Sequence, residues 1–103
     1  MSRGKRRPVD LGVIKFAKMG DAREHFHRML QSYQPGDVVG AEDGAQLAEL
    51  LKRHPDCAAK VGVGIAQFEV IEADFGSQCF AVRRVDGSFE DFSYKTCITE
   101  GRY

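Results

Sequence analysis

An Asp86-Gly87 pair stands between two runs in which apolar and polar residues roughly alternate, residues 78–85 and 88–95. Asp-Gly in that setting is among the strongest short-range signals for a β-hairpin, because a type I′ turn needs positive φ at both central positions. The feature that most constrains this chain is therefore an antiparallel hairpin in its second half.

The register of that hairpin predicts which residues share a face. If Val85 lies opposite Ser88, then Arg83 lies opposite Glu90. The face assigned to the core then carries Cys79, Ala81, Phe92 and Tyr94. The other face carries Phe80, Val82, Arg84, Phe89, Asp91 and Ser93. This second face mixes aromatic and charged groups, which suits neither full burial nor full exposure.

The first half of the chain is predicted to be helical. Asp21 with Glu24 three residues later resembles a capping box at a helix start. The apolar residues that follow at helical spacing are Ala22, Phe26, Met29, Leu30 and Tyr33. A second helix is expected over residues 42–53, with Leu47, Leu50 and Leu51 on one face. Pro55 ends it.

These elements predict a single-domain α+β protein. Residues 9–17 read as a first strand and residues 65–73 as the strand before the hairpin. We expect one antiparallel sheet, made of the first strand plus a C-terminal three-stranded meander, with two helices packed on one face. Gly62 and Gly64 are expected to let the backbone bend or pass close to another element. Residues 1–8 are predicted to be a basic flexible tail and residues 9–103 the domain.

Charge is distributed unevenly along the chain. Fifteen basic residues balance fifteen acidic ones, but four of the basic residues fall within the first eight positions: Arg3, Lys5, Arg6 and Arg7. Without these four, 11 basic residues face 15 acidic ones. The tail predicts weak, salt-sensitive attraction to nucleic acid, and an acidic body restricts any such site to a local patch. No apolar run approaches ~20 residues and no signal-type segment follows Met1, so we expect a cytoplasmic protein without membrane contact.

The residues that carry chemistry do not form a recognised catalytic or metal-binding pattern. The three cysteines, Cys57, Cys79 and Cys97, contain no C-x-x-C pair, which disfavours disulfides and zinc. His25 and His27 are two residues apart on a predicted helix and point in different directions. His54 beside Cys57 is the remaining base and thiol combination, although His54 reads more simply as the end of a helix. We expect no enzyme activity, no metal and no cofactor.

A series of ordered motifs resembles the DCL family, named for the plant phenotype "defective chloroplasts and leaves". The motifs are His54-Pro55, Lys60-x-Gly62-x-Gly64-Ile65, Cys79-Phe80-x-Val82-x-Arg84-x-Asp86-Gly87 and Asp91-Phe92-Ser93-Tyr94-x-x-Cys97-Ile98. The resemblance runs from about Phe16 to Ile98. It implies an RNA context, because plant members act in plastid ribosomal RNA processing and a similar domain ends the largest subunit of a plant-specific RNA polymerase. The resemblance implies no catalytic residues.

The leading hypothesis is a non-catalytic RNA-binding module of the bacterial cytoplasm, assisting ribosomal RNA processing or RNA-protein assembly. Cations and aromatic rings together suit RNA. The candidate contacts are Lys60, Phe80, Arg84, Phe89 and Lys95. The polar signature residues Asp91, Ser93 and Tyr94 form either part of one site with Arg84 or a structural network that fixes the hairpin. The alternative is a protein-interaction module, a monomer that docks a peptide or protein on its sheet face or strand edge.

Overall fold

The computed structural model describes residues 9–99. Its elements, in chain order, are β1 (Val9–Asp10), β2 (Lys15–Phe16), α1 (Met19–Gln31), α2 (Ala41–Leu51), α3 (Cys57–Val61), β3 (Ile65–Glu72), a single 3₁₀ turn η2 (Asp74–Gly76), β4 (Gln78–Arg84), β5 (Phe89–Phe92) and α4 (Tyr94–Thr99). The predicted tail over residues 1–8 lies outside this range. No helix within residues 9–99 is long and apolar enough to cross a membrane.

The α+β class and the C-terminal meander are confirmed. Strands β3, β4 and β5 form an antiparallel sheet in that order. Residues 9–17, however, do not add a strand to it. They fold back on themselves as a separate two-stranded hairpin, β1 with β2. Gly12 makes this reversal possible, since its φ of +83° suits glycine and its N–H donates to Asp10 Oδ1.

The register predicted for the β4–β5 hairpin is wrong by one residue. The observed partners are Phe80 with Phe92 and Val82 with Glu90. The turn is not type I′, because among its residues positive φ occurs at Gly87 alone. Instead Gly87 N–H donates to Arg84 O and Arg84 N–H to Ser88 O, which describes a three-residue loop ending in a left-handed glycine.

The one-residue shift inverts the predicted faces of β4, because strand side chains alternate with a period of two. Phe80 and Val82 point into the core with no exposed surface, and Phe92 joins them as predicted. Cys79 and Ala81 lie on the opposite side, which we call the outer face; Ala81 is fully buried there, as predicted, whereas Cys79 is partly exposed. There they neighbour Ile71, Glu69 and Asp91.

Helix α1 begins at Met19, two residues before the predicted start. Lys18 is its N-cap and makes no side-chain capping bond, so the predicted capping box of Asp21 and Glu24 does not form. The apolar stripe is confirmed: Ala22, Phe26, Met29 and Leu30 are buried. Helix α2 follows the prediction closely, with Leu47, Leu50 and Leu51 buried.

Two short helices were not predicted. Helix α3 follows Pro55, and α4 replaces the end of the expected third strand, so Tyr94 and Lys95 are helical. Ser93 starts α4, because its Oγ accepts the backbone N–H of Thr96. At the other end Arg53 donates to the carbonyls of Cys97 and Ile98.

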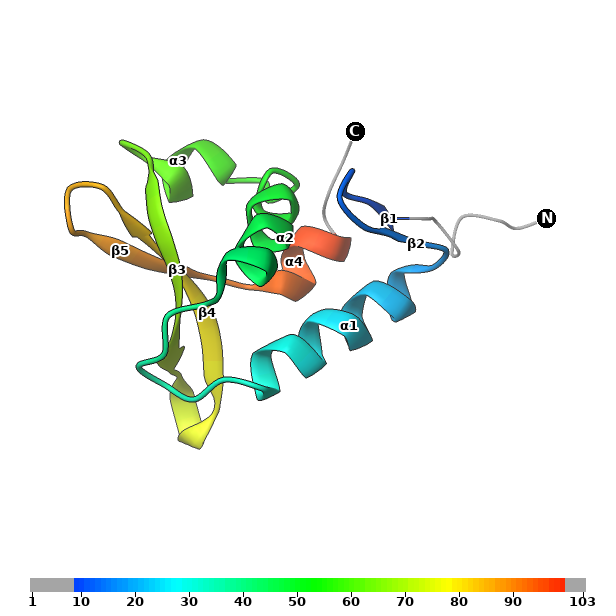
Figure 1. Cartoon of the computed structure of the whole chain (residues 1–103), viewed down its shortest axis with the longest axis horizontal. Helices are drawn as coiled ribbons and strands as arrows, with labels where there is room; N and C mark the ends of the chain where they lie inside the picture. Colours follow the sequence, from blue (N-terminus) through cyan, green and yellow to red (C-terminus); the bar gives the residue numbers. More distant parts are fainter. Residues whose placement is uncertain (1–8, 100–103) are drawn as a thin grey trace.

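The layers place the core on one side of the sheet. In Figure 1, α1, α2 and α4 lie on the same side of β3 and β4. Their buried residues meet Phe68, Val70 and Phe80 from the strands. Burial raises the pKa of the Cys97 thiol to about 12, so this cysteine acts as a small apolar residue of the core. The two edges of the sheet differ, because residues 36–39 pair with β3 while β5 is bordered by Lys60.

Candidate functional site

The cations at the base of the β4–β5 hairpin form an internal ion-pair cluster. Glu90 accepts from Arg84 Nη2 at 2.6 Å and from Lys60 Nζ at 3.1 Å. The hydrogen bonds from Lys60 and then Arg84 lower the pKa of Glu90 below its ordinary 4.5. The side chains of Lys60 and Arg84 are only 16% and 14% exposed. Two predicted phosphate contacts are thus already engaged within the protein.

Arg84 also fastens α3 to the sheet. Its guanidinium donates to the carbonyls of Ala59 and Lys60, at the end of α3, and to Ser88 Oγ. Gly62 leaves room for it, because a Cβ there would lie 2.8 Å from Arg84 Nε. The close approach expected at this glycine is confirmed. Arg84 therefore acts as a structural clamp, and we no longer place it in an RNA contact.

Lys60 has a second role at the free edge of the sheet. Its Nζ donates to the backbone carbonyl of Asp91 on β5 at 2.9 Å. Lys60 comes from α3 and not from the edge strand itself, and covering an edge with a neighbouring element is one of the usual devices that hinder pairing with another strand. The other edge is occupied, because Gly36 and Val39 donate to the carbonyls of β3. Addition of a peptide strand to this sheet is therefore disfavoured at both edges.

Phe80 cannot serve as a stacking surface. Its ring is fully buried among core aromatics, with centroids 6.1 Å from Phe92 and 6.2 Å from Tyr94. The prediction that Phe80 contacts RNA is wrong. The observed strand register differs by one residue from the predicted one, and this places the Phe80 side chain in the core. Phe89 is 51% exposed on the outer face, as a docking role requires.

The outer face is organised around Arg83, which the sequence analysis paired with Glu90. It instead forms a two-point ion pair with Glu69, both distances 2.9 Å, and its guanidinium carbon lies 4.9 Å from the Phe89 ring centroid. These contacts lower the pKa of the Glu69 carboxyl. Ala81 lies beside this cluster with no exposed surface and Cys79 is partly buried, so the outer face presents the Phe89 ring among charged groups.

Several predicted residues meet in one place, a cavity of about 420 Å³ where β5 ends and α4 begins. We call it the β5–α4 groove. It is lined by Leu30, His54, Lys60, Ala73, Gln78, Cys79, Asp91, Phe92, Ser93, Tyr94 and Lys95. Five of these were named from the sequence: Lys60, Asp91, Ser93, Tyr94 and Lys95. The single site of Arg84 with Asp91 and Ser93 does not form, because Arg84 turns to Glu90 on the inner side.

The groove combines fixed and free polar groups. Ser93 is held as the α4 N-cap, while Lys95 stands exposed one residue beyond Tyr94. The Tyr94 ring is buried, which raises its pKa, and its hydroxyl lies 3.4 Å from His27 Nδ1. The arrangement offers an ammonium and hydroxyl groups next to the exposed carboxylate of Asp91.

Gln78 is a lining residue that the sequence did not point to, and His54 is one that it named only as a helix end or as a base for Cys57. His54 Nδ1 accepts the N–H of Asp56, so in the neutral ring the proton sits on Nε2 and is available to a ligand. Its place in the His54-Pro55 motif was the signal. Gln78 donates to the carbonyls of Leu30 and Tyr33, tying the end of α1 to β4.

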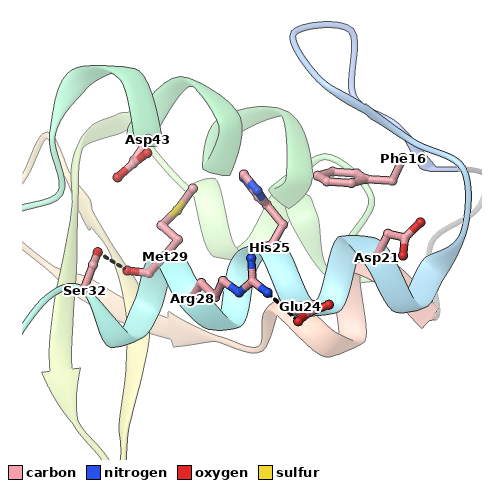
Figure 2. A pocket seen from close by; sticks show the side chains of 8 residues that line it. All are labelled: Phe16, Asp21, Glu24, His25, Arg28, Met29, Ser32 and Asp43. Atoms are coloured by element: carbon pink, nitrogen blue, oxygen red, sulfur yellow. Dashed lines mark hydrogen bonds and ion pairs between the residues drawn. The ribbon is translucent and has the colours of Figure 1, made fainter.

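A second cavity, of about 520 Å³, lies along α1 and has a different character. Figure 2 shows Phe16, His25 and Met29 lining it with three carboxylates: Asp21, Glu24 and Asp43. Most of its polar groups already have partners: Glu24 binds Arg28, Asp43 accepts from Tyr33, and His25 contacts Gln46. Its acidic lining does not favour phosphate. Within residues 9–99 no cluster of three or more histidine, cysteine or acidic side chains is placed to hold a metal ion.

Comparison with known proteins identifies relatives of this chain. The family described as "Protein of unknown function (DUF3223)" matches residues 27–98. The chain is 38% identical over 72 residues to DNA-directed RNA polymerase IV subunit 1 of Arabidopsis thaliana, covering 69% of this chain and 5% of that protein. It is 43% identical over 54 residues to Protein DCL, chloroplastic, of Solanum lycopersicum, covering 50% of this chain and 24% of that one. It therefore spans a small part of these two relatives.

The fold is shared with a solved structure. The solution NMR structure of an uncharacterized protein from Rhodospirillum rubrum superposes with a TM-score of 0.83 at 46% sequence identity, covering 94% of this chain and 91% of that one. These matches agree with the resemblance inferred from the ordered motifs.

Proposed function

This chain belongs to the DUF3223 family and is similar to DCL proteins, and from that premise we propose that it is a non-catalytic RNA-binding module. It would act in the cytoplasm, in ribosomal RNA processing or in another RNA-protein assembly. The proposed contact surface is the β5–α4 groove. The name of one relative, a subunit of a DNA-directed RNA polymerase, supports an RNA-related setting for this type of domain.

The observation that carries the proposal is the convergence of Lys60, Ser93, Tyr94 and Lys95 on one groove. Beyond the first eight residues the chain has 11 basic and 15 acidic residues, so an RNA site must depend on local chemistry rather than on net charge. The Lys95 ammonium suits a phosphate, while hydroxyls and the Asp91 carboxylate suit a ribose 2′-hydroxyl, which both donates and accepts.

Amide chemical-shift mapping by NMR tests the proposal. Labelled full-length protein is titrated with a short single-stranded oligouridine at low and at moderate salt. Saturable shifts at His54, Ser93 and Lys95 that persist at moderate salt are expected. Shifts confined to residues 2–8 that vanish with salt, or no shifts, would contradict the proposal.

A charge-reversed pair of variants provides the control. Lys95→Glu is expected to weaken RNA binding about tenfold and to reduce the salt dependence by about one phosphate contact. Lys15→Glu removes an equally exposed lysine from β2, which lends no residue to the groove, and is expected to change little. Equal losses in both variants would point to nonspecific electrostatics.

A protein-interaction module is the second candidate, favoured by the outer face of the sheet. There the half-exposed ring of Phe89 lies opposite Arg83, and the carboxylates of Glu69 and Asp91 flank the buried Ala81, a composition that suits protein better than phosphate. This second hypothesis predicts that a partner protein stays bound after nuclease treatment, and that the Phe89→Asp variant no longer binds this partner. Release of all partners by nuclease would count against it.

A further inference from the structure

The turn between β3 and β4 holds an unusual residue. Phe75 has φ +57° and ψ +37°, in the left-handed region, and its side chain is fully exposed. It is the one non-glycine residue with positive φ within residues 9–99. A large aromatic residue in that conformation is uncommon, since glycine, asparagine or aspartate fits it at lower cost.

The turn does not need this side chain in order to form. Ala73 N–H donates to Ser77 O, and both the N–H and the hydroxyl of Ser77 donate to Asp74 O. These backbone and hydroxyl contacts close the loop, while the Phe75 ring packs against nothing buried. An exposed aromatic ring on a strained backbone is a reason to look for a ligand.

Phe75 stands beside the proposed RNA site. Ala73 and Gln78, the residues that flank the turn on its two strands, both line the β5–α4 groove. The turn at the β3–β4 end of the sheet, at the bottom of Figure 1, therefore lies next to the Ala73 side of the groove.

We propose that Phe75 stacks on an unpaired base of single-stranded RNA whose backbone occupies the β5–α4 groove. This inference rests on the proposed RNA-binding function and adds the class of RNA that is recognised. Aromatic rings bind single strands by stacking, and this is tolerant of sequence because every base has a π-face. Bases within a duplex are already stacked and present no free face.

The charges near the turn favour a base over a phosphate at this position. Glu72 and Asp74 are exposed on either side of the turn's start, whereas the groove carries Lys60 and Lys95. Carboxylates repel phosphate but accept hydrogen bonds from the N–H groups of bases, such as the N3–H of uracil. The phosphates would thus lie toward the exposed Lys95 and the base toward Phe75.

Phe75→Trp gives a direct readout, because the chain contains no tryptophan. Stacking of a base on the new indole is expected to quench its fluorescence during titration with single-stranded oligouridine, with affinity equal to or tighter than that of the parent chain. Duplex RNA is expected to leave the emission unchanged.

Fluorescence anisotropy of labelled RNA measures the energetic effect. Phe75→Ser is expected to weaken oligouridine binding about tenfold and to leave weak duplex binding unaltered. Val85→Ser is the matched control, because Val85 is an exposed apolar residue at the opposite hairpin turn of the same strand. It is expected to bind like the parent chain.

The outcomes separate the inference from the proposed function. If Lys95→Glu weakens oligouridine binding while Phe75→Ser does not, or if Phe75→Trp shows no quenching, the stacking role is overturned and the RNA site stands. Equal losses for single-stranded and duplex RNA in Phe75→Ser also overturn it. If the parent chain binds neither RNA, both proposals fail, and the exposed aromatic turn belongs to a protein partner.

Discussion

Strand β4 is bounded by two turns that place different residues in the left-handed region. The turn to β5 has Gly87 there, at φ +92°, and the turn from β3 has Phe75 followed by Gly76. In the first turn Asp86 Oδ1 accepts from the N–H and the hydroxyl of Ser88, so residue types and conformation agree. In the second, a bulky residue occupies a position that suits glycine.

This difference distinguishes a turn selected for folding from one that carries a cost to stability. Natural sequences are locally consistent in most places, and departures concentrate at functional sites. The base of the 84–88 turn is also reinforced by the Arg84 clamp, whereas the side chain at the 73–77 turn is fully exposed. Substitutions in either of the two turns test this comparison.

The largest expected effect is at the base of the consistent turn. Arg84→Ala removes the link to Glu90 and leaves the carbonyls at the end of α3 without their donor, so we expect a loss of about 2–3 kcal/mol in the free energy of unfolding. Urea denaturation measures it. Arg83 is the more exposed of the two cations, 35% against 14%, so Arg83→Ala on the outer face is expected to cost less. A greater loss in Arg83→Ala would contradict the clamp.

Gly87→Ala tests the conformational requirement of the same turn. A Cβ meets no atom within 4 Å there, so strain at φ +92° is the main cost, about 1–2 kcal/mol. Thermal unfolding followed by circular dichroism checks this value. Val85→Ala, in the same loop without positive φ, serves as the control and should unfold like the parent chain. Equal stability of Gly87→Ala and the parent would show that the turn relaxes freely.

Phe75→Asn should act in the opposite direction. Asparagine tolerates the left-handed region and no packing is lost, so we expect stability to rise by up to about 1 kcal/mol. The same variant should bind single-stranded RNA more weakly. A gain in stability together with a loss of binding is the signature of a residue kept for function, and a loss of stability in Phe75→Asn would contradict the strain argument.

The smallest expected effect is a dependence on pH. The pKa of Glu90 in the folded protein lies below its ordinary 4.5 because Lys60 and Arg84 donate to it. The contribution of these ion pairs to the free energy of unfolding is fully present above pH 4.5, and it is lost as the pH falls through the pKa of Glu90 in the folded protein. The protection factors of amides near residues 84–90, corrected for the intrinsic exchange rate at each pH, should therefore fall in acid before those near the 73–77 turn. Glu90→Gln should flatten this dependence, and an unaltered acid profile in that variant would argue against it.

Helical periodicity and turn residues were good guides where structure depends on near neighbours. The apolar stripe of α1, the limits of α2 and the presence of a hairpin at Asp86-Gly87 could all be predicted. The register could not, because a two-residue and a three-residue loop share the same Asp-Gly signal and differ by one position. Because of this difference of one position, Phe80 lies in the core and not on the surface where it was expected, so it is not part of the site.

The sequence predicted several of the residues that form the candidate site, but it did not predict how these residues are arranged. Lys60, Ser93 and Lys95 were named from residue type and motif, yet what each does depends on contacts far along the chain. Lys60 meets Glu90 and Asp91 thirty or more positions away, and α4 forms where a strand was expected because Ser93 caps it and Arg53 holds its end. No local pattern encodes such distant partners.

By itself, the sequence determined the α+β class, the two main helices and the antiparallel meander, because apolar spacing and turn chemistry act over a few residues. Only the tertiary structure decided which side of β4 faces the core, which cations are used internally, and that His54, Ser93 and Lys95 share one groove. Strand register and side-chain pairing are set by packing between distant segments, and a shift of one residue reverses every face of a strand.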